Sequence, residues 1–271
     1  MDNSKVVYSL KLIEKALKES NNPVISFSGG KDSTVLLHLI IKVAGNSVPI
    51  LHINTGVEFP EALEFRDKQI EKHNLTLYEQ PAFPETYWTV VEKYGFPVGQ
   101  RGFKGGEATT KCCYYLKKKP LHRAIKRFNI DLNFTGIRAN ESHNRAIIRK
   151  THGDYYYNKR HKIKVCHPIM HWTNTEIDTY INNEGIELSP IYNKKLPEKP
   201  NYRIRTGCWA CPQGWNAGKS VWLKTYYPEF YTTLMKKGFA KYIMERKTGE
   251  SVTTNHALNI LKVRPCFFES L

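Results

Sequence analysis

The sequence predicts an α/β fold, a doubly wound and mostly parallel sheet with a C-terminal, mostly helical extension. Through the first 150 residues, short apolar runs of strand length alternate with runs of helical period, a pattern typical of parallel sheets covered on both faces. Farther along the chain, tyrosine, proline and basic residues replace the long apolar runs. We therefore expect an α/β core at 1–150 and a C-terminal region packed on it at 151–271.

The first half of the expected core follows from local patterns. Apolar residues at helical spacing after an Asn3 or Ser4 cap predict a helix over 4–19. The short apolar run 23–27 predicts a buried strand. The run 33–44 is apolar nearly all round and predicts a buried helix. A second buried strand is expected at 47–54.

The remaining elements rest on similar signals. Pro60 suits the first turn of a helix over 60–73, and Thr173 with Glu176 forms a capping box that opens another helix. Helical patterns with a proline inside them are expected to break near Pro120 and Pro228. The further expected strands are 75–80 and 130–136, and the further expected helices are 112–128, 173–185 and 219–238.

The formal net charge is +16, which favours polyanionic partners such as nucleic acid. The alternative is that the lysines are scattered over solvated faces. The longest apolar runs are far too short to span a membrane, and the N-terminus has no secretory signal pattern. We expect a cytoplasmic protein with no membrane partner, and a homodimer is kept as a hypothesis.

A Ser-Gly-Gly-Lys-Asp-Ser segment between the first strand and the next helix predicts a phosphate-binding loop. Ile25 stands where the Walker A pattern requires glycine, so the loop is of another type. Glycines let backbone N–H groups turn inward and the helix start adds positive charge. Asp32 is a candidate helix cap or Mg²⁺ ligand. The alternative is an ordinary βα turn. The candidate phosphate-binding residues are Ser28, Gly29, Gly30, Lys31, Asp32 and Ser33.

Two further turns follow strands of the predicted sheet, at Thr55-Gly56 and at Gly136-Ile137-Arg138. Ligands of open parallel sheets bind at the carboxyl ends of the strands. We therefore expect these turns and the phosphate loop to line one crevice.

The chain has six cysteines. Cys208 and Cys211 are spaced to point at one metal from a turn, whereas adjacent Cys112 and Cys113 are harder to direct at one zinc ion. An iron–sulfur cluster, zinc and unligated thiols all remain open on the residues alone. Cys166 is expected to pack in the core.

Six segments together resemble a known family. The segment "SGGKDS" resembles the PP-loop of N-type ATP pyrophosphatases. The others resemble, in order, motifs of the phosphoadenosine-phosphosulfate reductase branch: "INTGVEFPEALEF", "CCYYLKKKPL", "TGIRANESHNR", "HPIMHWTNTEIDTYI" and "SPIYNK…RTGCWACP". The resemblance runs from about residue 24 to 215 and implies an adenine nucleotide α-hydrolase-like fold.

The resemblance also implies an ATP pyrophosphatase that adenylates an acceptor and releases pyrophosphate, with Mg²⁺. The loop would hold the outer phosphates through Lys31 and Asp32. Arg138, and less directly Arg145, would neutralise charge that develops during transfer. The residues implied near adenosine are Ile53, Thr55, Gly56 and Gly136.

Iron–sulfur members of the family bind a [4Fe–4S] cluster with the pattern that Cys112, Cys113, Cys208 and Cys211 form here. Sulfonucleotide reductases carry a nucleophilic cysteine near the C-terminus, but the tail "KVRPCFFESL" lacks their glycine and histidine around Cys266. Cys266 is therefore a weaker catalytic candidate, either as that nucleophile or as a sulfur-accepting thiolate.

The features are closest to the iron–sulfur ATP pyrophosphatase of DNA phosphorothioation systems. The expected partners are a cysteine desulfurase or other sulfur donor, and DNA or a DNA-modification complex. The alternatives are an adenylylsulfate or phosphoadenylylsulfate reductase that makes sulfite and, less favoured, a tRNA-thiolating enzyme. Lys31 favours ATP, because a sulfonucleotide carries sulfate where ATP has its outer phosphates.

Overall fold

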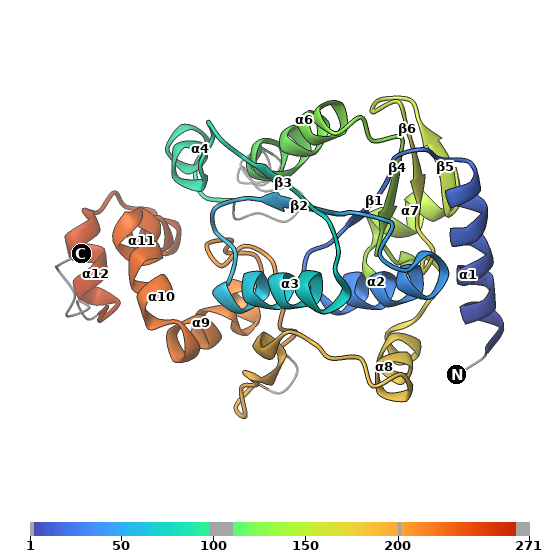
Figure 1. Ribbon diagram of the computed structural model, residues 1–271. Coiled ribbons are helices and arrows are strands. Elements are labelled where there is room, and N and C mark those ends of the chain that lie inside the picture. The colour runs from blue at the N-terminus through green and yellow to red at the C-terminus, as the bar shows by residue number, and fades with distance from the viewer. Residues whose placement is uncertain (1–2, 98–110, 200–201, 264–271) are drawn as a thin grey trace.

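A computed structural model describes residues 3–97, 111–199 and 202–263. Its centre is a six-stranded sheet of order β3-β2-β1-β4-β6-β5 (Figure 1). Neighbouring strands run parallel except β5 and β6, which are antiparallel. The strands are β1 (Pro23–Ser26), β2 (Ile50–Asn54), β3 (Leu77–Pro81), β4 (Leu132–Thr135), β5 (Tyr155–Asn158) and β6 (Ile163–Cys166). This confirms the predicted fold class.

The strand order reverses direction at β1. Ile25 of β1 pairs with Ile50 of β2 on one side and with Phe134 of β4 on the other. The chain leaves β1 toward β2 and returns to β4 only later, so the carboxyl ends of β1 and β4 form the topological switch point of the sheet. The phosphate loop and Gly136 both lie there.

Helices cover both faces of the sheet (Figure 1). Ile25 packs in a core with Leu36 and Ile40, while its neighbour Val24 packs on the opposite face with Ile125. The helices of the sheet region are α1 (Asn3–Lys18), α2 (Lys31–Ala44), α3 (Pro60–His73), α4 (Tyr87–Tyr94), α6 (Lys119–Arg127), α7 (His143–His152) and α8 (Asn174–Asn183). Short 3₁₀ turns are η2 (Ala139–Glu141) and η3 (Pro190–Asn193).

The C-terminal helices join the start of α3. The ring of Phe59 lies 5.4 Å from that of Trp222 and 4.9 Å from that of Tyr227, centroid to centroid. These helices are α9 (Ser220–Tyr226), α10 (Pro228–Leu234), α11 (Ala240–Thr248) and α12 (Thr254–Ile260), with wider turns η4 (Trp215–Lys219) and η5 (Met235–Phe239). Within the described parts of the chain, no helix is long and apolar enough to cross a membrane.

The expected helices and strands are present, but helices α4, α7, α11 and α12 were not expected. Two further differences concern Pro120 and the last two strands of the sheet. The helix does not break at Pro120, because the preceding turn η1 (Tyr114–Lys118) is widened and Lys119 N–H donates to the carbonyl of Tyr114. The β5–β6 hairpin was not predicted, because its strands, Tyr-Tyr-Tyr-Asn and Ile-Lys-Val-Cys, lack a continuous aliphatic run and the turn between them is basic. The sheet therefore extends past residue 150 to Cys166, which is fully buried as expected.

Candidate active site

The phosphate loop joins β1 to α2 and depends on one left-handed glycine. Gly29 has φ +68°, and a Cβ there would lie 3.2 Å from the carbonyl oxygen of Ala62. Both the backbone conformation and the close approach to α3 therefore require glycine. The loop is held in a tight turn against the first part of α3.

The backbone of this loop offers an anion-binding surface. Lys31 N–H donates to the hydroxyl of Tyr192 at 3.1 Å. Four other amide N–H groups have no acceptor within the described residues, those of Gly29, Gly30, Asp32 and Ser33. They lie at the N-terminus of α2, where the helix dipole also favours negative charge.

The hydroxyls of the loop are close together. Ser28 Oγ and Ser33 Oγ are 3.2 Å apart, and Ser33 Oγ donates to the carbonyl of Gly30 at 2.9 Å. The same carbonyl accepts from the amide and hydroxyl of Thr34, at 2.9 and 3.0 Å. The loop is thus fixed by its own polar groups.

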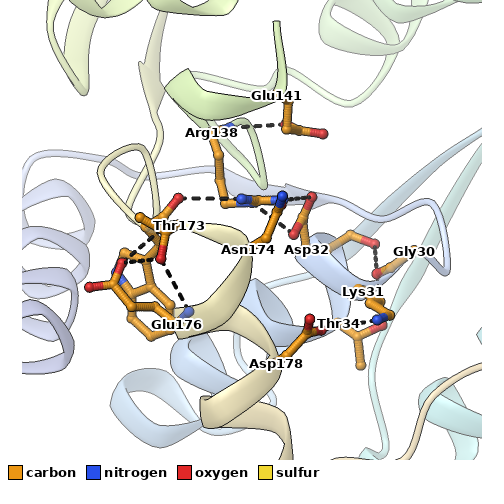
Figure 2. A network of polar contacts seen from close by, with 12 residues as sticks. Gly30, Lys31, Asp32, Thr34, Arg138, Glu141, Thr173, Asn174, Glu176 and Asp178 are labelled. Carbon is orange, nitrogen blue, oxygen red and sulfur yellow. Dashed lines mark hydrogen bonds and ion pairs between the residues drawn. The ribbon is translucent and has the colours of Figure 1, made fainter. Parts of the chain in front are cut away.

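The ammonium group of Lys31 is held beside the loop. Its Nζ donates to Asp178 Oδ1 of α8 at 3.0 Å (Figure 2) and lies 5.6 Å from the ring centroid of Tyr192. Both side chains of this ion pair are partly exposed to solvent. An anion in the loop would compete with Asp178 for Lys31.

Arg138 is buried and engaged by the protein. Its Nε donates to Asp32 Oδ1 at 2.9 Å and its second terminal nitrogen to Asp32 Oδ2 at 3.2 Å (Figure 2). It also donates to Asn174 Oδ1 at 2.9 Å and to the carbonyl of Trp172 at 3.3 Å. This arrangement fixes Asp32 on the first turn of α2. That Arg138 neutralises charge during transfer stays a prediction.

Gly136 brings the end of β4 against the start of α2. A Cβ at this position would lie 3.0 Å from the carbonyl carbon and oxygen of Asp32 and 3.1 Å from the amide nitrogen of Ser33. A backbone obstacle of this kind cannot rotate away. Gly136 therefore has a packing role, and its implied position near adenosine stays a prediction.

Arg145, on α7, forms an ion pair with Glu141. Burial lowers the pKa of Arg145, the charge of Asp32 raises it, and Arg205 and Arg138 lower it further. Of the three guanidinium groups, that of Arg138 makes the hydrogen bonds to Asp32 within the described residues. Sequence reasoning missed Arg205, which is exposed at this position.

The turn after β2 is ordered by Glu58. Its Oε1 accepts from both the amide and the hydroxyl of Thr55, each at 2.7 Å, while Gly56 N–H donates to Asn54 Oδ1 at 2.9 Å. Ile53 packs in the core on the α6 side of the sheet. Contact of these residues with adenosine stays a prediction.

The same turn reaches the predicted cysteine site. Thr55 Oγ1 lies 3.5 Å from Cys208 Sγ. Burial raises the pKa of the Cys112 thiol to about 12, helped by Cys113, Cys208 and Cys211. Cys112 and Cys208, from two distant segments, pack in the same cluster of apolar side chains.

The four cysteines suit a cluster better than a single metal ion. Among the described residues, no three His, Cys, Asp or Glu side chains converge closely enough for one metal ion. A [4Fe–4S] cluster has a different requirement, because each thiolate binds a separate iron atom. The donor set fits such a cluster.

Two lysines whose place the sequence did not indicate border the cysteines: Lys219, which is buried, and Lys117, which is exposed. Lys219 Nζ donates to the carbonyl of Cys208 at 3.0 Å and to that of Cys211 at 2.5 Å. The charge of Cys208, with smaller effects of Cys113 and Cys211, raises the pKa of Lys117. Both cations would offset the negative charge of ligated thiolates.

Other residues at the loop were also missed, although they lie in segments whose pattern was recognised. Asn174 and Asp178 are four positions apart on α8, so both face the loop. Tyr192 and Thr206 approach Gly30, where a Cβ would lie 3.1 Å from Thr206 Oγ1. Cys266 lies outside the described residues.

A glycine-containing loop with free amide groups, at the switch point of a sheet of this order, is typical of the adenine nucleotide α-hydrolase-like class of α/β proteins. Residues 22–214 match the family model described as phosphoadenosine phosphosulfate reductase domain. The chain belongs to this family.

Curated relatives agree with this membership. An uncharacterized protein of Methanocaldococcus jannaschii is 30% identical over 223 residues, which cover 81% of this chain and 42% of that protein. Sulfate adenylyltransferase subunit 2 of Shewanella putrefaciens is 31% identical over 207 residues, which cover 68% of this chain and 64% of that protein. The chain thus spans less than two thirds of either relative.

Solved structures share the fold. A phosphoadenylyl-sulfate reductase from Candida auris superposes with a TM-score of 0.55 at 17% identity, over 74% of this chain and 88% of the other. A U34-tRNA thiolase from Methanococcus maripaludis, which contains a [4Fe–4S] cluster, gives a TM-score of 0.51 at 12% identity, over 100% of this chain and 84% of the other. At these identities the likeness concerns the fold alone.

Proposed function

We propose that the protein is a PP-loop ATP pyrophosphatase that adenylates an acceptor for sulfur incorporation. The observation that carries this proposal is the loop with four unpaired amide N–H groups and the ammonium of Lys31 beside them. Such a site suits the β- and γ-phosphates of ATP, which carry most of the charge of the nucleotide.

In the proposed reaction, an acceptor oxygen attacks the α-phosphorus of ATP, and the bond from the α-phosphorus to the bridging oxygen breaks. The electron pair leaves with pyrophosphate, on which negative charge increases. The loop amides, the hydroxyls of Ser28 and Ser33, and Lys31 would stabilise that charge as it develops. Mg²⁺, bound with the phosphates, would neutralise further charge, and Asp32 is the nearest carboxylate of the loop for it.

Sulfur incorporation is the expected outcome of this activation. We propose a DNA backbone phosphate as the acceptor, with a cysteine desulfurase or other sulfur donor as partner, as in DNA phosphorothioation. The net charge of +16 supports a nucleic-acid acceptor. The four cysteines would hold a [4Fe–4S] cluster close to the turn after β2.

A second candidate acceptor is sulfate. It is favoured by the similarity to sulfate adenylyltransferase subunit 2. The product would then be adenylylsulfate, and pyrophosphate would still leave from the same loop. A sulfonucleotide reductase is less well supported, because its substrate has no outer phosphates for Lys31 to bind.

One set of assays separates these functions. Anaerobically reconstituted protein is incubated with ATP and Mg²⁺, alone, with sulfate, or with duplex DNA, and pyrophosphate is measured. Parallel reactions contain adenylylsulfate or phosphoadenylylsulfate with thioredoxin, and sulfite is measured. We expect pyrophosphate and no sulfite. Sulfite without pyrophosphate would overturn the proposal, and formation of adenylylsulfate would select sulfate as the acceptor.

Lys31→Ala tests the loop directly and is expected to abolish pyrophosphate release. Lys42→Ala is a matched control, because Lys42 lies on the same helix and forms an ion pair with Glu184, the residue after α8, as Lys31 does with Asp178. If Lys31→Ala releases pyrophosphate at the same rate as Lys42→Ala and wild type, the loop is not the phosphate site.

A further inference from the structure

We propose that α7 and the turn between β5 and β6 form a docking surface for the phosphate backbone of duplex DNA. We call it the basic surface, and it consists of Arg149, Lys150, Lys159, Arg160 and Lys162. The proposal deepens the proposed function, on which it rests for the choice of DNA as the acceptor. It assigns the binding of that acceptor to residues outside the phosphate loop.

The first observation concerns α7. This helix of ten residues buries none of its side chains, and Ile147 is 44% exposed. A surface helix of a globular protein normally buries an apolar stripe against its core. Helix α7 instead presents its sides to solvent beside the phosphate loop.

The second observation is the charge of this segment. Residues 143–164 contain seven Lys or Arg residues and a single acidic residue, Asp154. Among the described residues, Asp154 forms no ion pair with the basic surface: its carboxylate accepts from the hydroxyl of Tyr8 at 2.5 Å and lies 3.2 Å from His171 Nε2.

The cations of the segment divide into two sets. Arg145 pairs with Glu141 and Lys164 with Glu19. The other five, which make up the basic surface, have no ion pair within the part of the chain that the structure describes. Unpaired cations gathered on one segment are what a polyanion binds, with release of its counterions.

The third observation is continuity with the site. Arg145, in the first turn of α7, forms an ion pair with Glu141, whose Oε2 also accepts from the backbone N–H of Arg138, the partner of Asp32, so the helix leads from the phosphate loop to the surface. The chain then runs along β5, an edge strand of the sheet, so this strand joins the cations of α7 at its start to those of the turn at its far end. A helix of ten residues extends about 15 Å, and duplex DNA carries a negative charge about every 1.7 Å along its axis. Several phosphates would therefore lie along the basic surface.

An exposed helix can also be covered by a second copy of the same chain. The positive charge of the basic surface argues against this. A two-fold interface would bring the cations of one copy against those of the other, because the same patch is used on both sides. Exposed Ile147 and Tyr157 lie among the cations and would contact sugars.

The test is binding of a fluorescent duplex of about 25 base pairs to the full chain, measured by anisotropy at several salt concentrations. We compare wild type with Arg149→Glu/Lys150→Glu and with Lys159→Glu/Arg160→Glu. The matched control is Lys236→Glu/Lys247→Glu, which makes the same change of charge at exposed positions in the C-terminal helices, away from α7 (Figure 1).

Each test variant is expected to bind at least about tenfold more weakly, and the slope of log K against log salt should fall by about 2 in magnitude. The control should bind like wild type. Equal loss in the control, no loss in the test variants, tighter binding of tRNA than of duplex, or a change of oligomeric state in the α7 variant would each overturn the proposal.

The result is separable from the proposed function. Pyrophosphate release without DNA depends on the phosphate loop, so the test variants should retain it at the wild-type rate. If the protein binds DNA but releases no pyrophosphate, the proposed reaction is wrong and the proposed docking surface is retained. If the protein releases pyrophosphate but does not bind DNA, the docking surface is wrong and the reaction is retained.

Discussion

Arg138 and Asp32 are joined by two parallel hydrogen bonds, from Nε to Oδ1 at 2.9 Å and from a terminal nitrogen to Oδ2 at 3.2 Å. This contact ties the segment after β4 to the first turn of α2. A planar guanidinium makes both bonds at once, whereas an ammonium is a point donor. The orientation of the phosphate loop therefore depends on an arginine that the protein itself saturates.

Arg138→Met is expected to lower the free energy of unfolding by about 3 kcal/mol, because the loss of one partner leaves a partly buried carboxylate unpaired. Arg138→Lys should cost less stability, yet should still weaken ATP binding because the fork is lost. Urea unfolding and calorimetry with a non-hydrolysable ATP analogue measure the two effects. Lys68→Gln, which breaks an exposed ion pair with Glu187, should change stability by less than about 1 kcal/mol.

Gly136→Ala should disturb the same junction from the side of β4. The added methyl group would meet the backbone of Asp32 and Ser33 at 3.0–3.1 Å, so α2 must shift. We expect a loss of about 1–3 kcal/mol of stability and weaker ATP binding. Gly207→Ala is the control, since a Cβ there meets nothing within 4 Å. Equal stability of both variants would refute the close packing.

Local signals explain which parts of the site were predictable. The strand, glycine turn and helix around Lys31 are adjacent in the sequence, so hydrophobic period and glycine chemistry define them. Asp178 and Tyr192 reach the loop only through the tertiary fold, and their segments predict a capped helix and a turn without indicating this contact. The four cysteines were predicted through the family pattern, whereas Lys219 reaches two of their carbonyls only after the chain has folded.

Asp178→Asn should increase the affinity for ATP. The ammonium of Lys31 is shared between Asp178 in the free protein and phosphate in the complex, so removing the carboxylate removes a competitor. The pair is partly exposed, so the gain is limited to about 1 kcal/mol, or about fivefold in Kd. Calorimetric titration with the analogue measures it. Unchanged or weaker binding would mean that Asp178 positions Lys31 for the nucleotide.

His167 predicts a loss of stability in acid. Burial lowers its pKa to about 4 from 6.5, and its Nδ1 lies 2.6 Å from Thr135 Oγ1. Between pH 6.5 and 4 the unfolded chain binds a proton at this position and the folded chain does not. Its contribution is therefore complete above pH 6.5 and is lost as the pH falls toward 4, by up to about 3 kcal/mol.

Urea unfolding of wild type and His167→Gln at pH 7.5, 6 and 5 tests this. The variant should show a shallower fall of unfolding free energy with decreasing pH. His256→Gln, at an exposed position of α12, should keep the wild-type slope. Parallel slopes for wild type and His167→Gln would contradict the assignment.

Lys219 is expected to control the cysteine site. The residue is 8% exposed, and its ammonium donates to the carbonyls of both Cys208 and Cys211. A buried cation so close to thiolates stabilises their negative charge, and it favours the more negative, reduced state of a bound cluster. Lys219→Met should therefore lower the iron and sulfide content of reconstituted protein and make the midpoint potential more negative.

Lys219→Arg keeps the charge and should retain more iron than Lys219→Met. Lys224→Met removes an exposed lysine of the next helix and should match wild type in iron content and potential. Iron analysis and spectroelectrochemistry give both values without any assay of activity. Wild-type protein that binds no iron would end the cluster proposal itself. If Lys219→Met has the iron content and midpoint potential of wild type, the charge of Lys219 has no effect on the thiolates. The lysine then only stabilises the turn that contains Cys208 and Cys211.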